Sequence, residues 1–183
     1  LEKDRLSTAL QARTLGLQVR LLMAQADAVD PILRELADVV RESELLIGYP
    51  LEPLVKILTE LGKVHGSQPV YDELFETVVQ IASRRKGEVS AARMLLTRGA
   101  QQLDDGKYYE AIRTLGRVLG RLYKHESRHD AVQALYLCAR AYEQVGLLWA
   151  ARGTMLSAAS IATNEFWAYD KVTPQQAVCY HRI

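Results

Sequence analysis

Apolar residues recur at intervals of three and four along most of the chain. Examples are Ile32, Leu33, Leu36, Val39 and Val40, followed by Leu54, Ile57, Leu58 and Leu61. This spacing matches the 3.6-residue period of an amphipathic α-helix. Alternating runs rich in Val, Ile, Thr and Tyr, which are typical of strands, do not occur. The pattern therefore predicts an all-α chain.

Proline and glycine divide this pattern into segments of helical length. Pro31, Pro53 and Pro174 suit the first turn of a helix, where the missing N–H is not needed. Five glycines suit left-handed caps at helix ends: Gly48, Gly66, Gly87, Gly106 and Gly146. We therefore predict helices over residues 3–25, 29–47, 51–65, 69–85, 88–104, 108–123, 129–145 and 148–163, and a further helix over residues 174–183.

The predicted helices form hairpins that repeat along the chain. One hairpin has Leu95, Gly99, Gly106, Tyr108, Ala111, Ile112, Leu115 and Val118. Forty residues later come Leu135, Ala139, Gly146, Leu148, Ala151, Met155 and Ala158, and 37 residues earlier a looser match has Leu58, Gly62, Tyr71, Leu74, Val78 and Ile81. A small residue in the first helix lets the second helix cross close to it. Each hairpin leaves an apolar face for the next hairpin to bury, as in a solenoid.

One hairpin resembles a tetratricopeptide repeat at Gly99, Gly106, Tyr108, Ala111 and Ile112, and a second does so at Ala139, Tyr142, Gly146, Ala151 and Ala158. The spacings of 37 and 40 residues exceed the family's 34, and no proline closes either repeat. The resemblance implies a right-handed superhelix of antiparallel helix hairpins. It places repeats at residues 51–85, 88–123 and 129–163 of a region that spans 48–183, with 1–47 as a capping or degenerate hairpin.

The resemblance also implies a concave groove that binds a partner and carries no chemistry of its own. The positions that would line it are Arg93, Leu96, Thr97 and Ala100 in one repeat and Gln133, Tyr136, Leu137, Arg140 and Gln144 in the next. A groove that mixes Leu, Tyr and Arg suits an amphipathic helix or an extended peptide with an acidic group. Leu96 and Leu137 could equally pack against the neighbouring hairpin. A carboxylate clamp of Lys and Asn, found in chaperone-binding members of the family, is not expected.

One short motif points to different chemistry. His125-Glu126-Ser127-Arg128-His129 spells H-E-x-x-H, the zinc-binding pattern of metalloproteases. On one continuous helix, His125 and His129 would share a face and Glu126 would act as general base. The charged neighbours and the position between two hairpins argue against a buried metal site. A zinc hydrolase is therefore a minor alternative, and we expect no metal.

The remaining reactive residues give no enzymatic signature. Cys138 lies among Leu137 and Ala139, where a free cysteine acts as a small buried apolar residue. Cys179 lies near His181, but no oxyanion-hole motif accompanies it. Glycine-rich phosphate-binding loops and the G-x-S-x-G motif do not occur. We therefore expect neither enzyme activity nor a cofactor.

Charge is unevenly distributed, although the total is only +1. Residues 1–83 carry 8 Lys+Arg against 13 Asp+Glu, and residues 84–128 carry 11 against 5. Arg113, Arg117 and Arg121 form a stripe along one face of a predicted helix. This stripe could dock an acidic protein or a nucleic acid, but a solvated face is the favoured interpretation. Nucleic acid is not expected as a partner.

The chain of 183 residues lacks a run of about 20 apolar residues, so we expect no membrane contact and a cytoplasmic location. It begins without Met and stops at Ile183 inside a predicted helix, which suggests a piece of a longer protein. The sequence thus predicts a non-catalytic scaffold that binds a protein or peptide through its concave face. A regulatory or sensor segment of a multidomain signalling protein is the alternative. Further expected contacts are neighbouring repeats of the parent chain and a homodimer through exposed repeat ends.

Overall fold

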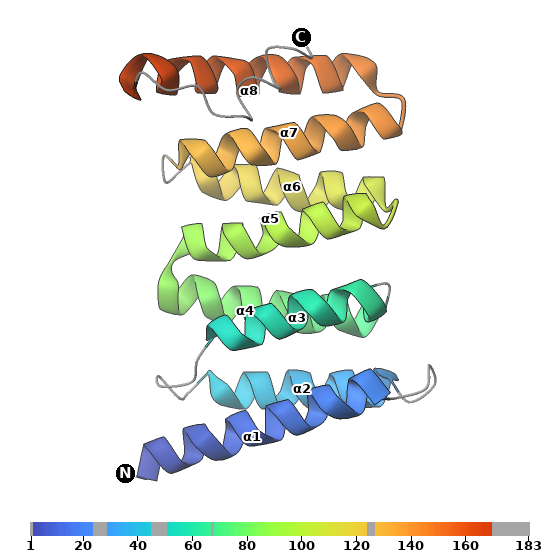
Figure 1. Cartoon of the computed structure of the whole chain (residues 1–183), viewed down its shortest axis with the longest axis vertical. Helices are drawn as coiled ribbons and strands as arrows, with labels where there is room; N and C mark the ends of the chain where they lie inside the picture. The colour runs from blue at the N-terminus through green and yellow to red at the C-terminus, as the bar shows by residue number, and fades with distance from the viewer. Residues whose placement is uncertain (1, 24–28, 45–50, 67, 124–126, 170–183) are drawn as a thin grey trace. The chain divides into compact units, whose positions relative to one another are not determined.

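The computed structural model describes residues 2–23, 29–44, 51–66, 68–123 and 127–169. Regular secondary structure in these ranges is helical throughout, so the prediction of an all-α chain is confirmed for them (Figure 1). The helices are α1 (Glu2–Met23), α2 (Val29–Ser43), α3 (Leu51–His65), α4 (Pro69–Lys86), α5 (Glu88–Asp104), α6 (Tyr108–Leu122), α7 (Arg128–Gln144) and α8 (Leu148–Tyr169). The predicted helix at 174–183 lies outside the described ranges, as do Gly48 and the predicted division at residues 47 and 48.

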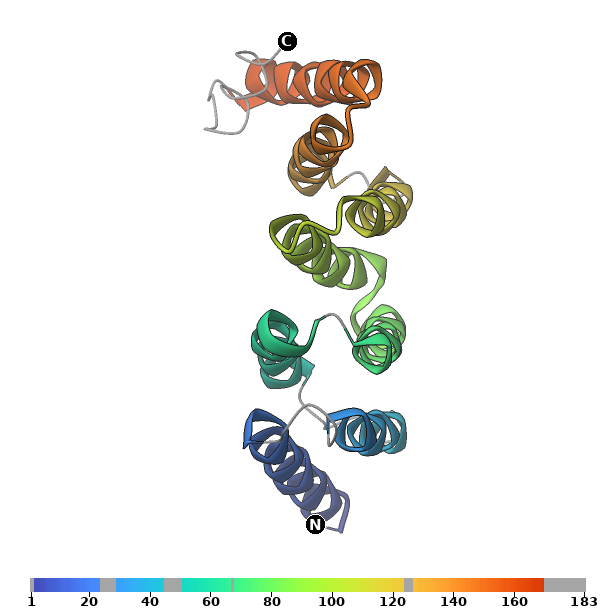
Figure 2. The ribbon, with the colours of Figure 1, turned by 90° about the vertical axis from the view of Figure 1, so that its right-hand side faces the viewer.

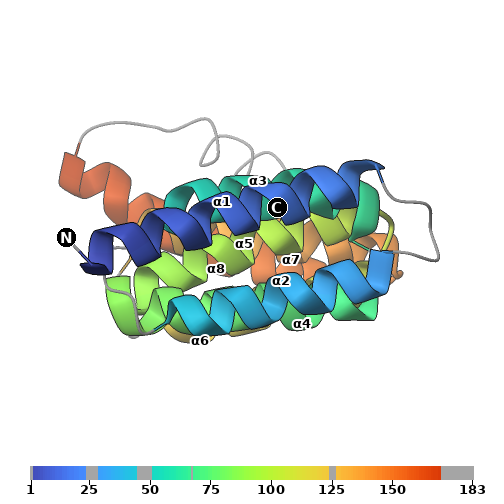
Figure 3. The same cartoon turned by 90° about the horizontal axis from the view of Figure 1, so that it is seen from below.

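The helices gather into two compact units, residues 1–85 and 86–183. Within each unit, consecutive helices pack as antiparallel pairs (Figure 2). In the first unit, α1 and α3 lie on one side and α2 and α4 on the other (Figures 2 and 3). In the ranges that the structure describes, no helix is long and apolar enough to cross a membrane.

Arginine side chains join the helices of the first unit. Arg20 on α1 forms an ion pair with Glu35 on α2 at 3.3 Å. Arg41 on α2 pairs with Glu73 on α4 at 2.7 Å. Arg85, near the end of α4, donates from Nη2 to the backbone carbonyls of Ser43 (2.5 Å) and Glu44 (3.0 Å). The last carbonyls of a helix lack an intrahelical donor, so Arg85 acts as a C-terminal cap of α2 that is supplied by another helix.

Tyr71 fixes α4 against α3. Its side chain is fully buried, and its hydroxyl donates a hydrogen bond to the backbone carbonyl of Leu58. Its ring lies 6.1 Å from that of Phe75, centroid to centroid. The burial of a tyrosine requires a partner for its hydroxyl, and Leu58 provides one. Tyr108, which occupies the matching place in the predicted repeat register, is only half-buried.

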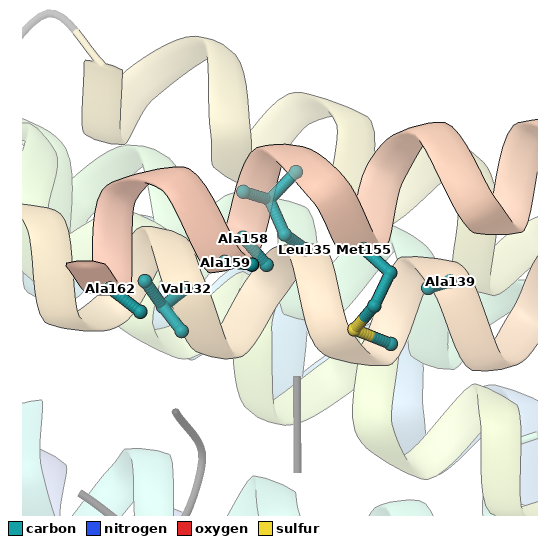
Figure 4. Packing of buried hydrophobic residues seen from close by; sticks show 7 residues of the cluster. All are labelled: Val132, Leu135, Ala139, Met155, Ala158, Ala159 and Ala162. Atoms are coloured by element: carbon teal, nitrogen blue, oxygen red, sulfur yellow. The ribbon is translucent and has the colours of Figure 1, made fainter. Parts of the chain in front are cut away.

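The second unit contains the close helix crossing that the repeat pattern predicts. A Cβ atom added at Gly99 on α5 would lie 2.7 Å from Cδ2 of Leu115 on α6. The glycine is therefore required by the approach of a fully buried leucine. Forty residues on, the matching positions Ala139 and Met155 are both buried between α7 and α8 (Figure 4). Their cluster consists of Val132, Leu135, Ala139, Met155, Ala158, Ala159 and Ala162.

Two of the predicted glycine caps are confirmed, and one is wrong. Gly106 and Gly146 have φ of 76° and 77°. The next residues donate backbone hydrogen bonds five residues back, Lys107 to Gln102 and Leu147 to Tyr142, which completes the Schellman arrangement. Gly87 also has positive φ, 86°, but its ψ is 169°. It is thus extended and precedes α5, in a region of backbone space open almost only to glycine, rather than capping α4 in a left-handed turn.

Candidate partner-binding surface

The two helices that carry the predicted groove residues, α5 and α7, contact each other. Nε of Arg93 on α5 donates to Oδ2 of Asp130 on α7 at 2.8 Å. The same carboxylate oxygen accepts from the hydroxyl of Ser127 at 2.8 Å. Asp130 is nearly buried, whereas most of the Arg93 side chain is exposed. The predicted groove residues therefore lie on two helices that contact each other.

The predicted groove residues differ in how much surface they present. Arg93, Thr97 and Gln144 are exposed, and Ala100, Gln133, Tyr136, Leu137 and Arg140 are partly buried. Leu96 is only 6% exposed and belongs to the core. Leu96 therefore offers a partner almost no surface, and the alternative of internal packing describes it better.

Tyr136 and Leu137 each contact the core on one side and solvent on the other. Tyr136 packs against the cluster that includes Met155, and Leu137 packs against a smaller cluster of Leu103, Ala111 and Ala141. Both residues are partly exposed, so their outer surfaces remain open. A substitution at either position would disturb the fold together with the surface. Polar residues of the same surface, Arg140 above all, are better probes of binding.

Most of the residues predicted to shape the repeats lie in the interior of their units, whereas the two turn glycines, Gly106 and Gly146, are exposed. Gly62, Ala111, Ala139, Ala151 and Ala158 are buried, and Tyr108 is half-buried against the cluster of Leu103, Ala111 and Ala141. The nearest atoms to an added Cβ at Gly99 all belong to Leu115, whereas Ala111 packs with Leu103 and Ala141. Ala111 therefore joins three helices, α5, α6 and α7.

The H-E-x-x-H motif does not lie on one helix. Helix α6 ends at Leu122 and α7 begins at Arg128, so His129 is an exposed residue of the first turn of α7. His125 and Glu126 lie outside the described residues. Among the residues that the structure describes, no group of three or more His, Cys, Asp or Glu side chains is placed to hold a metal ion.

Cys138 is a free, buried cysteine on α7, as the sequence predicts. Burial raises the pKa of its thiol, and a hydrogen bond with Tyr142, one turn later, lowers it by a smaller amount. Burial raises the pKa of the Tyr142 hydroxyl, and the contact with Cys138 raises it further. The thiolate is the reactive form, so this thiol is poorly suited to nucleophilic chemistry. Cys179 and His181 lie outside the described ranges.

Slow alkylation of Cys138 is the expected result for the folded protein. In a Cys179→Ser variant, iodoacetamide should modify Cys138 more slowly than a free cysteine at pH 7.5, because both access and thiolate fraction are reduced. The rate should keep rising beyond pH 9, since the thiol pKa is raised. Mass spectrometry of samples quenched between pH 7 and pH 10 measures this. Alkylation of the folded protein at the rate of a free cysteine at pH 7.5 would contradict this prediction. As a control, the protein unfolded in urea should react at the rate of a free cysteine.

The basic stripe on α6 is only partly available. Arg113 and Arg117 are exposed. Arg121 has a side chain that is 26% exposed, and it pairs with Glu88 in the first turn of α5 at 3.0 Å. Arg121 therefore links α6 to α5 through an ion pair. This weakens the case for a continuous docking surface along the three arginines.

Sequence reasoning missed two features of the second unit. Arg98 on α5 is 2% exposed, which is rare for a charged side chain. Trp149 is 83% exposed at the start of α8, with the Arg152 guanidinium 5.8 Å from its ring centroid. A signal for Trp149 exists in the run Leu147-Leu148-Trp149. A helix that packs through one face cannot bury three successive apolar residues.

No protein-family model matches the chain, and no curated protein matches it either. Within the residues that the structure describes, the chain is all-helical and its consecutive helices pack as antiparallel pairs.

Proposed function

We propose that the chain is a non-catalytic protein-interaction scaffold of tetratricopeptide-like hairpins, and that the α5–α7 surface binds a peptide or helix with an acidic group. The observation that supports this function is the contact between α5 and α7, the two helices that carry the predicted groove residues. A right-handed superhelix and a cytoplasmic location belong to the same proposal. Both follow from the repeat resemblance and the sequence pattern.

Arg140 supplies the charge in this proposal. The Arg93 guanidinium is already paired with Asp130, so part of its charge is neutralised. Arg140 is partly buried on α7 and makes no ion pair with the residues that the structure describes. A guanidinium on a partly buried surface binds a carboxylate through two parallel hydrogen bonds, which gives both affinity and orientation. Gln133 and Gln144 add amide groups that can pair with a peptide backbone.

A peptide selection tests the proposal. A random peptide library displayed on phage is selected on the purified chain, and synthetic copies of the enriched peptides are measured by fluorescence anisotropy. We expect enriched peptides to carry Asp or Glu beside apolar residues. Arg140→Glu should weaken their binding by tenfold or more, which corresponds to about 1.4 kcal/mol. Replacing the peptide acid with Arg should restore part of the loss.

Arg113→Glu is the matched control, because Arg113 is an exposed arginine on α6 outside the proposed surface. It makes the same change of charge and should leave binding unchanged at moderate salt. Equal loss in both variants would indicate a general charge effect. Loss in Arg113→Glu alone would assign binding to the α6 stripe and refute the α5–α7 surface.

A further inference from the structure

The Arg93 guanidinium on α5 is bound to the protein along one edge and open along the other. Its Nε donates to Oδ2 of Asp130, whose side chain is 11% exposed, whereas the Arg93 side chain is 65% exposed. Its terminal nitrogens, Nη1 and Nη2, make no hydrogen bond or ion pair with the residues that the structure describes. The fork of terminal N–H groups is therefore available to an acceptor outside the chain.

The contact with Asp130 holds this fork in position. Asp130 lies in the first turn of α7, and its Oδ2 also accepts a hydrogen bond from the hydroxyl of Ser127, which precedes the helix. A guanidinium that is already oriented loses less side-chain entropy when its remaining donors bind a second carboxylate. Arg93 thus suits an acidic group of a partner, although part of its charge is neutralised by Asp130.

A second guanidinium lies further along the same surface. Arg140 is partly buried on α7 and makes no ion pair with the residues that the structure describes. Asp130 and Arg140 are ten residues apart on one continuous helix, which corresponds to about 15 Å along its axis. Because Arg93 contacts Asp130, the two guanidinium groups are separated by roughly this distance along the α5–α7 surface.

Gln133 lies between the two cations along α7 and is partly buried. Its side-chain amide has donors and an acceptor that can pair with the backbone of an extended peptide. The backbone groups of a helix are bonded internally, so this position favours an extended partner. Side chains four residues apart project from the same face of an extended chain at about 13 Å, which matches the separation of the two guanidinium groups.

We propose that the α5–α7 surface binds an extended peptide with two acidic side chains about four residues apart, one at Arg93 and the other at Arg140. This inference rests on the proposed function of the same surface and adds a second acid subsite to it. Arg93 contacts the partner in this subsite, and Asp130 is a positioning residue that acts through Arg93.

Fluorescence anisotropy of the full 183-residue chain with the peptides enriched by phage selection tests the second subsite. We expect these peptides to carry two acids at the stated spacing. Arg93→Gln should weaken binding of a two-acid peptide by about fivefold. Replacing one peptide acid with its amide should remove the effect of Arg93→Gln, and replacing the other should remove the effect of Arg140→Gln. In a double-mutant cycle, each arginine should therefore couple to a different acid.

Arg93→Lys keeps the charge but lacks Nε and the planar fork, so it should lose as much affinity as Arg93→Gln. Asp130→Asn keeps an oxygen acceptor for Nε and removes the competing negative charge. It should tighten binding of the two-acid peptide and leave binding of the peptide without the Arg93-facing acid unchanged; a merely structural role would affect both peptides alike. Arg113→Gln, an exposed arginine on α6, is the matched control and should change neither. Circular dichroism verifies that each variant is folded.

The two proposals on this surface fail in different ways. Equal affinity for one-acid and two-acid peptides would overturn the second subsite, as would a loss in Arg93→Gln that is the same for both peptides. If Arg140→Glu still weakens binding in that case, the proposed function stands without the second subsite. Absence of any acid-dependent binding would overturn both.

Discussion

Leu115→Ala is expected to lower the free energy of unfolding of the second unit by about 2–5 kcal/mol, the range for removing a buried leucine side chain. Leu115 is fully buried, and its Cγ and Cδ2 atoms lie directly over Gly99. The lost side chain leaves a cavity at the crossing of α5 and α6. Gly99→Ala alone should also destabilise, because its new Cβ atom would stand 2.7 Å from Leu115 Cδ2.

The combination of the two changes is the sharper test. With Leu115 truncated, Gly99→Ala should become stabilising, because the methyl group enters free space and alanine favours the helix by about 1 kcal/mol over glycine. The coupling between the two changes should therefore be about 0.5–3 kcal/mol. Urea unfolding combined with hydrogen exchange over residues 88–163 measures it.

Gly116→Ala provides the control on α6, since a Cβ atom there would meet no other atom within 4 Å. It should stabilise by up to about 1 kcal/mol in both backgrounds. If Gly99→Ala behaves like Gly116→Ala in the presence of Leu115, the close crossing of α5 and α6 is not formed.

Tyr71→Ala is expected to cost the first unit about 3–5 kcal/mol, by analogy with other aromatic truncations in cores. The change removes a fully buried ring, its contact with Phe75 and its hydrogen bond to Leu58. Tyr71→Phe keeps the ring and should cost only about 1 kcal/mol, the net contribution of one hydrogen bond. Hydrogen exchange should show the loss across residues 51–86.

Tyr108→Phe is the matched control, because Tyr108 occupies the corresponding repeat position in a half-buried place. It should change the stability of the second unit by less than about 0.5 kcal/mol, as surface substitutions do. Similar losses of stability in Tyr71→Phe and Tyr108→Phe would show that the two hairpins use this position in the same way. That result would contradict the difference in burial between Tyr71 and Tyr108.

The helices could be predicted because their signals are local. The apolar period and the turn residues reproduce the bounds of α3 and α5. They place the ends of the other described helices within four residues, except that α8 extends six residues beyond its predicted end at residue 163. The caps at Gly106 and Gly146 were predicted correctly because a Schellman cap needs a residue that accepts positive φ. The prediction of a left-handed cap at Gly87 was wrong because a glycine in the sequence indicates a position with positive φ but does not indicate the value of ψ.

The candidate surface was less predictable because it depends on residues that are distant in the sequence. The pairing of Arg93 with Asp130 joins positions 37 residues apart. The burial of Leu96 depends on which face of α5 meets the neighbouring helices. An apolar residue at the edge of a helical stripe can be either buried or exposed. The exposure of Leu15, Val19 and Leu22 on α1 could not be predicted, because leucines on more than one face of a helix look like an ordinary apolar segment.

Arg84 and Arg85 have a consequence for synthesis of the chain. These two residues close the first unit by reaching back to Ser43 and Glu44 at the end of α2. The contacts span about 40 residues and cannot form until the last turn of α4 has left the ribosome. A nascent chain that stops before residue 84 should therefore hold α2 with an open end and resist proteases poorly. Emergence of these two arginines would be the moment at which the unit becomes resistant.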